Sequence, residues 1–121
     1  MRVKDAVGRF GEQVAADRLR AAGLTLVARN WRCRDGELDI VARDGGSLVF
    51  VEVKTRSSRA YGDPAEAIGA AKAARIRRLA LRWIEENRTP DWFWDSIRFD
   101  VVTVVRRPSG APDVAHLRGA F

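Results

Sequence analysis

The chain has 121 residues, of which 46% are hydrophobic and 31% are charged. These values are typical of one folded domain, here spanning residues 1–121, and they exclude a disordered protein. Twenty-two lysines and arginines against 16 aspartates and glutamates leave a net charge of +6, which favours a polyanionic partner such as nucleic acid.

Cysteine usage and hydropathy indicate the compartment. Cys33 is the single cysteine, so an internal disulfide is excluded, and one thiol alone cannot make a zinc site. The polar start over residues 1–5 is followed by no long apolar run, so neither a signal peptide nor a membrane span is expected. A cytoplasmic location is the simplest expectation.

The first predicted element is a helix over residues 8–22, with Gly23 at the left-handed position that ends helices. Its apolar stripe contains Ala15, Ala16, Leu19 and Ala22, and Glu12 lies in line with that stripe. Glu12 either stays in water and favours the helix dipole or points toward charges on a neighbouring strand. Position alone leaves both interpretations open.

Three strands follow, and the third is the most informative. The predicted ranges are 24–32, 37–43 and 47–56, with turns at Arg34-Asp35-Gly36 and Asp44-Gly45-Gly46. The third strand begins apolar on both faces, but Glu52 and Lys54 then continue the row that Leu48 and Phe50 begin. Burying charges is costly unless they have partners. This strand is therefore expected to lead from the core to a site.

Asp39 introduces a charge into the second strand, where the pattern otherwise suits burial. It shares one face with Glu37 and Val41. An antiparallel register can place Asp39 beside Glu52, although the sequence does not fix that register.

A polar loop is predicted over residues 55–63, followed by a helix start at Asp63-Pro64-Ala65-Glu66. Gly69 separates this start from the main helix over residues 70–87. Arg75, Arg78 and Arg82 fall together on one face of that helix. Lys72 lies along the inward stripe, where it either extends past the edge of the core or contacts a phosphate.

The last third of the chain begins where Thr89-Pro90 stops the helix. The aromatic cluster Trp92-Phe93-Trp94 is predicted to cover the core or to contact another copy of the chain. A strand over residues 97–105, a turn and a short edge strand over residues 114–117 complete the pattern. His116 is expected on the surface of the edge strand, because nothing pairs it with a nucleophile or a second ligand, and neither it nor Cys33 is assigned a chemical role.

Asp39, Glu52 and Lys54 permit two kinds of chemistry. Two carboxylates about 5 Å apart repel by roughly 3 kcal/mol at an effective dielectric near 20. Lys54 can relieve this as part of an ordinary ion-pair network, which is the simpler interpretation of the spacing alone. Alternatively, the two acids hold Mg²⁺ while Lys54 faces a substrate phosphate.

The order of the parts resembles the restriction-endonuclease-like superfamily, the PD-(D/E)xK nucleases, and more closely the small YraN-type family. The resemblance covers nearly the whole chain, through Gly8-Arg9-Phe10-Gly11-Glu12, Asn30-Trp31-Arg32, Gly36-Glu37-Leu38-Asp39, Val49-Phe50-Val51-Glu52-Val53-Lys54, Lys72, Arg98-Phe99-Asp100-Val101-Val102 and Ala120-Phe121. Gly69-Ala70-Ala71 departs from the Thr-Pro helix start that relatives often have before this lysine.

The resemblance implies an α/β fold with a restriction-endonuclease-like core in the order α-β-β-β-α-β, as in Holliday-junction resolvases. A mixed sheet is flanked by helices, and a short C-terminal edge strand follows. The resemblance also maps metal-binding acids onto Asp39 and Glu52, a catalytic lysine onto Lys54 and a helix acid onto Glu12.

Three hypotheses follow. The first is an Mg²⁺-dependent DNA endonuclease, with Mn²⁺ as a substitute, that hydrolyses phosphodiester bonds in duplex or branched DNA. Its metal ligands are Asp39 and Glu52, with the Val53 carbonyl as a candidate third. The residues expected to contact the DNA backbone are Arg56, Lys72, Arg75, Arg78 and Arg82.

The second hypothesis is a nucleic-acid-binding accessory protein that does not cut. The third makes the aromatic cluster a protein interface and the charge an aid to solubility. A homodimer would suit paired-strand cleavage by analogy only.

Overall fold

The computed structural model describes residues 6–57 and 68–121. It confirms the predicted α/β order, and the bounds differ from the prediction by a few residues. The elements are α1 (Ala6–Ala21), β1 (Thr25–Cys33), β2 (Gly36–Asp44), β3 (Ser47–Arg56), α2 (Ala70–Asn87), β4 (Ser96–Val105) and β5 (Asp113–Leu117).

The predicted loop between β3 and α2 is only partly tested. Thr55 and Arg56 were placed both in the third strand and in the loop, and they belong to β3, so the strand bounds 47–56 are confirmed and the predicted loop begins two residues too early. The remainder of the loop and the helix start at Asp63–Glu66 lie outside the described residues, apart from the bend at Ser57. Helix α2 begins directly after Gly69, as the pattern predicted.

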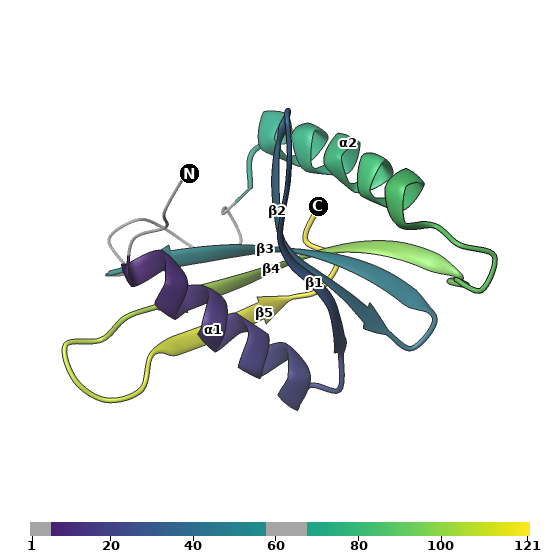
Figure 1. The fold of residues 1–121 in the computed structure, drawn as a ribbon. Coiled ribbons are helices and arrows are strands. Elements are labelled where there is room, and N and C mark those ends of the chain that lie inside the picture. The colour runs from purple at the N-terminus through teal and green to yellow at the C-terminus, as the bar shows by residue number, and fades with distance from the viewer. Residues whose placement is uncertain (1–5, 58–67) are drawn as a thin grey trace.

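One five-stranded sheet forms the centre of the molecule, in the order β1-β2-β3-β4-β5 (Figure 1). Strands β3 and β4 pair in parallel, whereas the other three pairs are antiparallel. A parallel pair needs a crossover connection, and α2 lies in that crossover. The predicted mixed sheet is therefore confirmed.

The two helices cover opposite faces of the sheet (Figure 1). Val49, Val51 and Val53 of β3 pack toward Ala15 and Leu19 of α1. On the other face, Leu48 and Phe50 belong to a cluster with α2, through residues that include Ile76, Leu79 and Trp83. The predicted division of β3 into two faces is correct. No helix among the described residues is long and apolar enough to cross a membrane.

The aromatic cluster after α2 extends the second core, as one of its two interpretations predicted. Trp92 packs against Trp83 with ring centroids 5.5 Å apart, and Trp94 packs against Trp92 at 5.8 Å. Phe93 between them is 75% exposed. The two tryptophans therefore cover the edge of the core.

Helix α1 packs closely on β3 at Gly11. A Cβ atom at this position would lie 1.8 Å from Oγ1 of Thr55 and 2.8 Å from its Cβ. We therefore expect Gly11→Ala to lower the free energy of unfolding by about 2 kcal/mol, because well-packed interiors do not accept added volume. Urea denaturation followed by circular dichroism measures this.

The control for the stability lost in Gly11→Ala is a change in the side chain that it would contact. Thr55→Ala removes Oγ1 and Cγ2, so part of the loss is expected to return in the double variant Gly11→Ala/Thr55→Ala. Strictly additive effects of the two substitutions would contradict this close approach.

A buried polar network joins β4 to β5 and corrects the prediction for His116. Asp100, which is 0% exposed, accepts hydrogen bonds from Arg98 Nε at 2.9 Å and from the backbone N–H of Gly119 at 3.0 Å. Its Oδ2 lies 2.7 Å from Nε2 of His116, whose side chain is only 7% exposed. His116 lies on the edge strand as expected, but its side chain is largely covered and paired with Asp100, so the expectation of a surface residue is wrong.

The network holds Asp100 in its charged form. Burial raises the pKa of Asp100, but hydrogen bonds from Arg98, Gly119 and His116 outweigh burial and lower the pKa below its ordinary value. Arg98 also donates to Asp44 at the end of β2, with 2.9 Å between Nη1 and Oδ2. The network thus ties three strands together across one face of the sheet.

Candidate functional site

The candidate site begins where β2 and β3 stop pairing. The last paired residues are Ile40 and Val51, and the next positions in this register are Asp39 and Glu52. Instead of a further backbone partner, the N–H of Val53 donates to Oδ2 of Asp39 at 2.9 Å. Asp39 is thereby fixed against β3, on the strand next to Glu52. The register that the sequence left open is the one that brings the two acids together.

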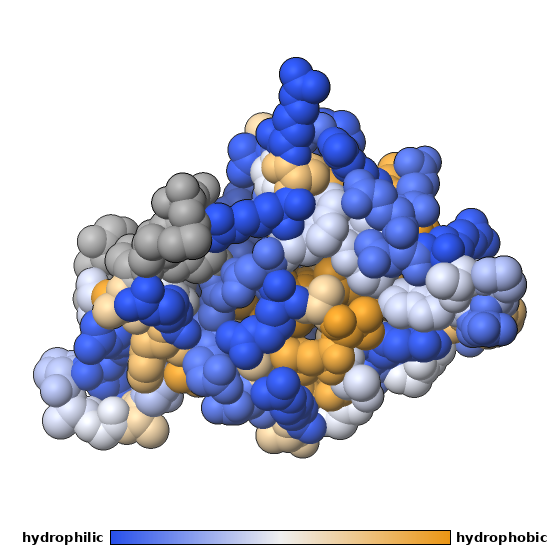
Figure 2. Space-filling model, in the orientation of Figure 1, coloured by the Kyte–Doolittle hydropathy of each residue, from blue (hydrophilic) through white to orange (hydrophobic). Residues whose placement is uncertain are grey.

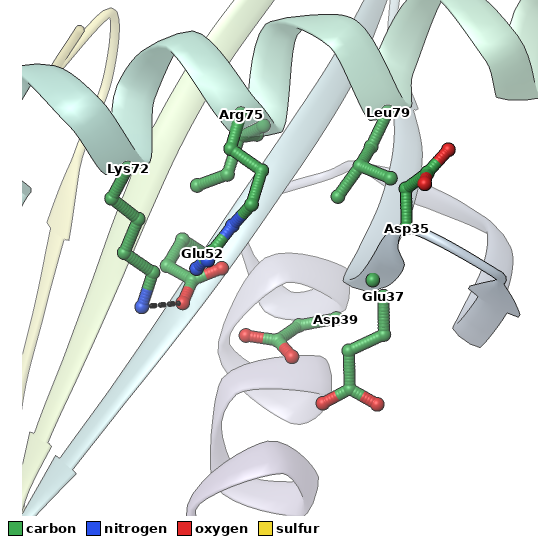
Figure 3. Close-up of a pocket in the computed structure, with 9 residues that line it drawn as sticks. Asp35, Glu37, Asp39, Glu52, Lys72, Arg75 and Leu79 are labelled. Carbon is green, nitrogen blue, oxygen red and sulfur yellow. Dashed lines mark ion pairs between the residues drawn. The ribbon is translucent and has the colours of Figure 1, made fainter.

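A cavity of about 300 Å³ lies between this part of the sheet and the first half of α2. Its lining residues come from β2, β3, α2 and the turn before β2, and they are Asp35, Gly36, Glu37, Asp39, Glu52, Lys72, Arg75, Ile76 and Leu79. In Figure 3, Lys72 and Arg75 reach down from α2 toward Glu52, with the Asp39 carboxylate below it on β2, while the Glu37 carboxylate points away from α2. The walls therefore carry both signs of charge at close range.

Lys72 and Glu52 form the central ion pair of the cavity, with 2.7 Å between Nζ and Oε1. Burial raises the pKa of Glu52, and the negative charge of Asp39 raises it further. Burial lowers the pKa of Lys72, but its hydrogen bond to Glu52 outweighs this and raises the pKa overall. Lys72 was predicted to contact a phosphate or to extend past the edge of the core; the structure shows its ammonium on a site acid, and the phosphate contact stays a prediction.

Lys54 lies beside this pair but does not line the cavity. Burial and the neighbouring Lys72 lower its pKa to about 8, against the opposing effect of Glu52. The predicted trio of Asp39, Glu52 and Lys54 is thus gathered at one end of β3, with Lys54 at the margin.

Glu12 lies on the opposite side of the sheet from α2. It is buried on α1, only 4% exposed, and its neighbour Gly11 contacts Thr55 of β3. It does not line the cavity.

The basic residues predicted to contact DNA lie on two elements, α2 and the end of β3. Arg75, Arg78 and Arg82 line a second cavity of about 300 Å³, which shares Asp35, Arg75 and Leu79 with the first. Hydrophilic side chains cover the surface over α2 and the β1–β2 tip in Figure 2. Arg82 is paired with Asp35 at 3.0 Å and with Glu86 at 3.1 Å. Arg56 lies at the end of β3, where it donates to the Thr55 carbonyl.

Two acids of the cavity were not predicted as site residues. Glu37 lines it from β2 and pairs with Arg32 at 3.1 Å, and Asp35 lines it from the hairpin tip. The alternation along β2 contained the signal for Glu37, because it placed Glu37 on the face of Asp39. Asp35 belongs to a turn, where no alternation applies.

The donor set limits which metal the cavity can hold. Among residues 6–57 and 68–121, no three side chains of His, Cys, Asp or Glu are grouped closely enough to hold a metal ion. Mg²⁺, however, is commonly bound through one or two carboxylates, with waters and substrate phosphates as the other ligands. Asp39 and Glu52 fit that requirement, since they are adjacent hard-oxygen donors at a cavity that already attracts the Lys72 ammonium.

The fold and the cavity define a small α/β protein with an acid- and lysine-lined site between its central sheet and its second helix. Residues 11–104 match the uncharacterised protein family UPF0102, and the chain belongs to that family. This is the family that the YraN-type resemblance indicated.

Similar proteins match along almost their entire length. A UPF0102 protein of Frankia alni is 59% identical over 122 residues, which cover 100% of this chain and 98% of the relative. A UPF0102 protein of Beutenbergia cavernae is 59% identical over 119 residues, covering 98% of each chain. One of Streptomyces griseus is 48% identical over 119 residues, again 98% of each chain.

Proposed function

We propose that this protein is a magnesium-dependent DNA endonuclease that hydrolyses phosphodiester bonds, with branched DNA among its substrates. The observation that carries the proposal is the placement of Asp39 and Glu52 at the end of the β2–β3 pairing, where both line one cavity. Two buried or half-buried carboxylates held side by side destabilise each other unless a cation lies between them.

In this proposal Asp39 and Glu52 bind the ion, and the Val53 carbonyl is a candidate further ligand. Bound Mg²⁺ would supply Lewis-acid activation of the attacking water and neutralise charge on the phosphoryl group. The hydrogen bond from Val53 N–H leaves Asp39 little freedom to rotate, so its carboxylate is positioned before any ligand arrives. Glu12 is buried on α1 and does not line the cavity, so in this proposal it would act as an outer-shell or second-metal group.

Lysines and arginines supply the remaining chemistry. Lys54, on the same face of β3 as Glu52, stabilises charge that develops on the phosphoryl oxygens or orients the attacking water. Arg75 and Arg78 line the cavity that adjoins the site, so they can hold the phosphates that flank the cleaved bond. Such contacts position DNA without reading its bases.

The superfamily assignment belongs to the same proposal. The order of these parts is the one expected of PD-(D/E)xK nucleases: an acid on β2, then Glu52-x-Lys54 on β3, then a basic helix. The fold alone does not fix the reaction, since one fold hosts many functions. The acids and lysines of the cavity are what favour phosphodiester hydrolysis.

A second candidate function is a nucleic-acid-binding protein that does not cut. The observation in its favour is that both acids already have partners in the protein: Glu52 has Lys72, and Asp39 has the Val53 N–H. The acids would then stabilise the fold, while the arginines of α2 would bind the backbone of the nucleic acid.

One experiment separates the two functions. The purified protein is incubated with labelled duplex, flap and four-way-junction DNA in Mg²⁺ or Mn²⁺, with EDTA and Asp39→Asn as controls. We expect cleavage of at least one substrate that EDTA and Asp39→Asn abolish. Binding that falls with salt, needs no divalent ion and leaves every substrate intact would instead establish the non-cutting protein.

A further inference from the structure

We infer that Lys72 is a tethered cation that occupies the metal position of the site and leaves Glu52 when a divalent ion binds. This inference rests on the proposed function. Its basis is the contact between Lys72 Nζ and Glu52 Oε1, 2.7 Å long, inside the cavity that Asp39 also lines. In Figure 3 the ammonium comes from α2, across the cavity from the strand acids.

The location of Lys72 is electrostatically unfavourable apart from this contact. Lys72 is the third residue of α2. The first turn of this helix contains no acidic residue, and its N-cap, Gly69, has no side chain that could accept a hydrogen bond from the helix N–H groups. The N-terminal end of a helix carries partial positive charge, so a lysine there is disfavoured. Lys54 adds a second positive group nearby. The acids of the cavity are therefore what hold Lys72 in place.

A divalent ion and the ammonium compete for the same oxygen. A divalent ion on the Glu52 carboxylate would lie close to the Lys72 ammonium, which is 2.7 Å from Oε1, and the two like charges would repel each other in this partly buried site. The side chain of Lys72 has a flexible four-carbon stem and is 31% exposed. Its ammonium can therefore move away from Glu52 without any backbone movement.

Displacement changes what Lys72 can bind. Once released from Glu52, the ammonium still lies in the cavity with Arg75, where a phosphate of the DNA would enter. Metal binding then strengthens phosphate binding, and by linkage phosphate strengthens metal binding. The site would thus hold its metal weakly until DNA arrives.

The test measures Mn²⁺ binding to the DNA-free protein by isothermal titration calorimetry and by electron paramagnetic resonance of the free ion. We expect Lys72→Met to bind Mn²⁺ more tightly than the wild type, by about threefold to tenfold, since a competing ion pair has been removed. Arg75→Met is the matched control, because it removes one positive charge from the same cavity without breaking the Glu52 contact. Its effect is expected to stay below about twofold. Lys72→Arg, which keeps the charge, is expected to bind as the wild type does.

The outcomes distinguish this inference from the proposed function. If the wild type binds Mn²⁺ and Lys72→Met binds it equally or more weakly, the tethered-cation role is overturned and the proposed metal site stands. Equal tightening in Lys72→Met and Arg75→Met overturns it too, since net charge alone would explain the result. If neither the wild type nor any variant binds Mn²⁺, the proposed function is overturned together with the inference.

Discussion

Glu52→Gln is expected to lower the rate of DNA cleavage by at least about a thousandfold, because a neutral amide cannot replace a carboxylate that binds the metal. The measurement is single-turnover cleavage of whichever DNA substrate the wild type cuts, at saturating Mg²⁺. The amide has nearly the shape of the carboxylate, so the cavity should keep its form.

The same variant is expected to fold as stably as the wild type, within about 1 kcal/mol. Burial and Asp39 raise the pKa of Glu52 in the folded protein. A carboxyl group with a raised folded pKa favours folding at low pH, and this contribution is lost as the pH rises through that pKa. Above that pKa the negative charge therefore opposes folding, and its removal offsets the lost ion pair with Lys72. Wild-type cleavage by Glu52→Gln would contradict the proposed role of this acid.

Asp100→Asn is expected to lower the free energy of unfolding by about 3 kcal/mol, the usual effect of removing one partner from a buried ion pair. The carboxylate is fully buried and receives hydrogen bonds from Arg98 and the Gly119 N–H, with His116 beside it. Guanidinium denaturation at neutral pH measures the change. Arg107→Ala is the control: its ion pair with Asp113 is exposed and 3.8 Å long, so less than about 0.5 kcal/mol is expected.

The pH dependence of this difference follows from the lowered pKa of Asp100. A carboxyl group whose pKa is lowered in the folded state contributes stability above its unfolded pKa of 3.8. That contribution is lost as the pH falls through the folded pKa. The gap between the wild type and Asp100→Asn should therefore be largest near neutral pH and shrink below pH 3.8. A gap that stayed constant into strong acid would show that charge does not cause it.

Local patterns predicted most of the fold because they reflect which side chains face the core. The alternation along β3 correctly separated Val49, Val51 and Val53 from Leu48 and Phe50, since each set packs under a different helix. The spacing in α2 likewise predicted its buried stripe, including Ile76, Leu79 and Trp83. The beginning of the loop after β3 was misplaced, because Thr55 and Arg56 are polar residues that nevertheless continue the pairing with β4.

The partners of the charged residues were harder to predict, because they depend on the distance between elements that are remote in the chain. The contact between Lys72 and Glu52 depends on how α2 is rotated over the sheet. His116 meets Asp100 only because β5 pairs with β4 in one register, with Val102 opposite His116. Arg98 and Asp100 did share a strand face in the sequence, and that pair was the available signal for a buried network.

The parallel pairing of β3 with β4 sets the order in which the chain can acquire its structure. The hairpins of β1, β2 and β3 are local, but β3 meets β4 through partners such as Val51 and Asp100, 49 positions apart in the sequence. Contacts of such separation form late, since a long loop must close first. During synthesis, β3, whose first half is apolar on both faces, therefore emerges with one open edge, which is prone to aggregate until β4 arrives.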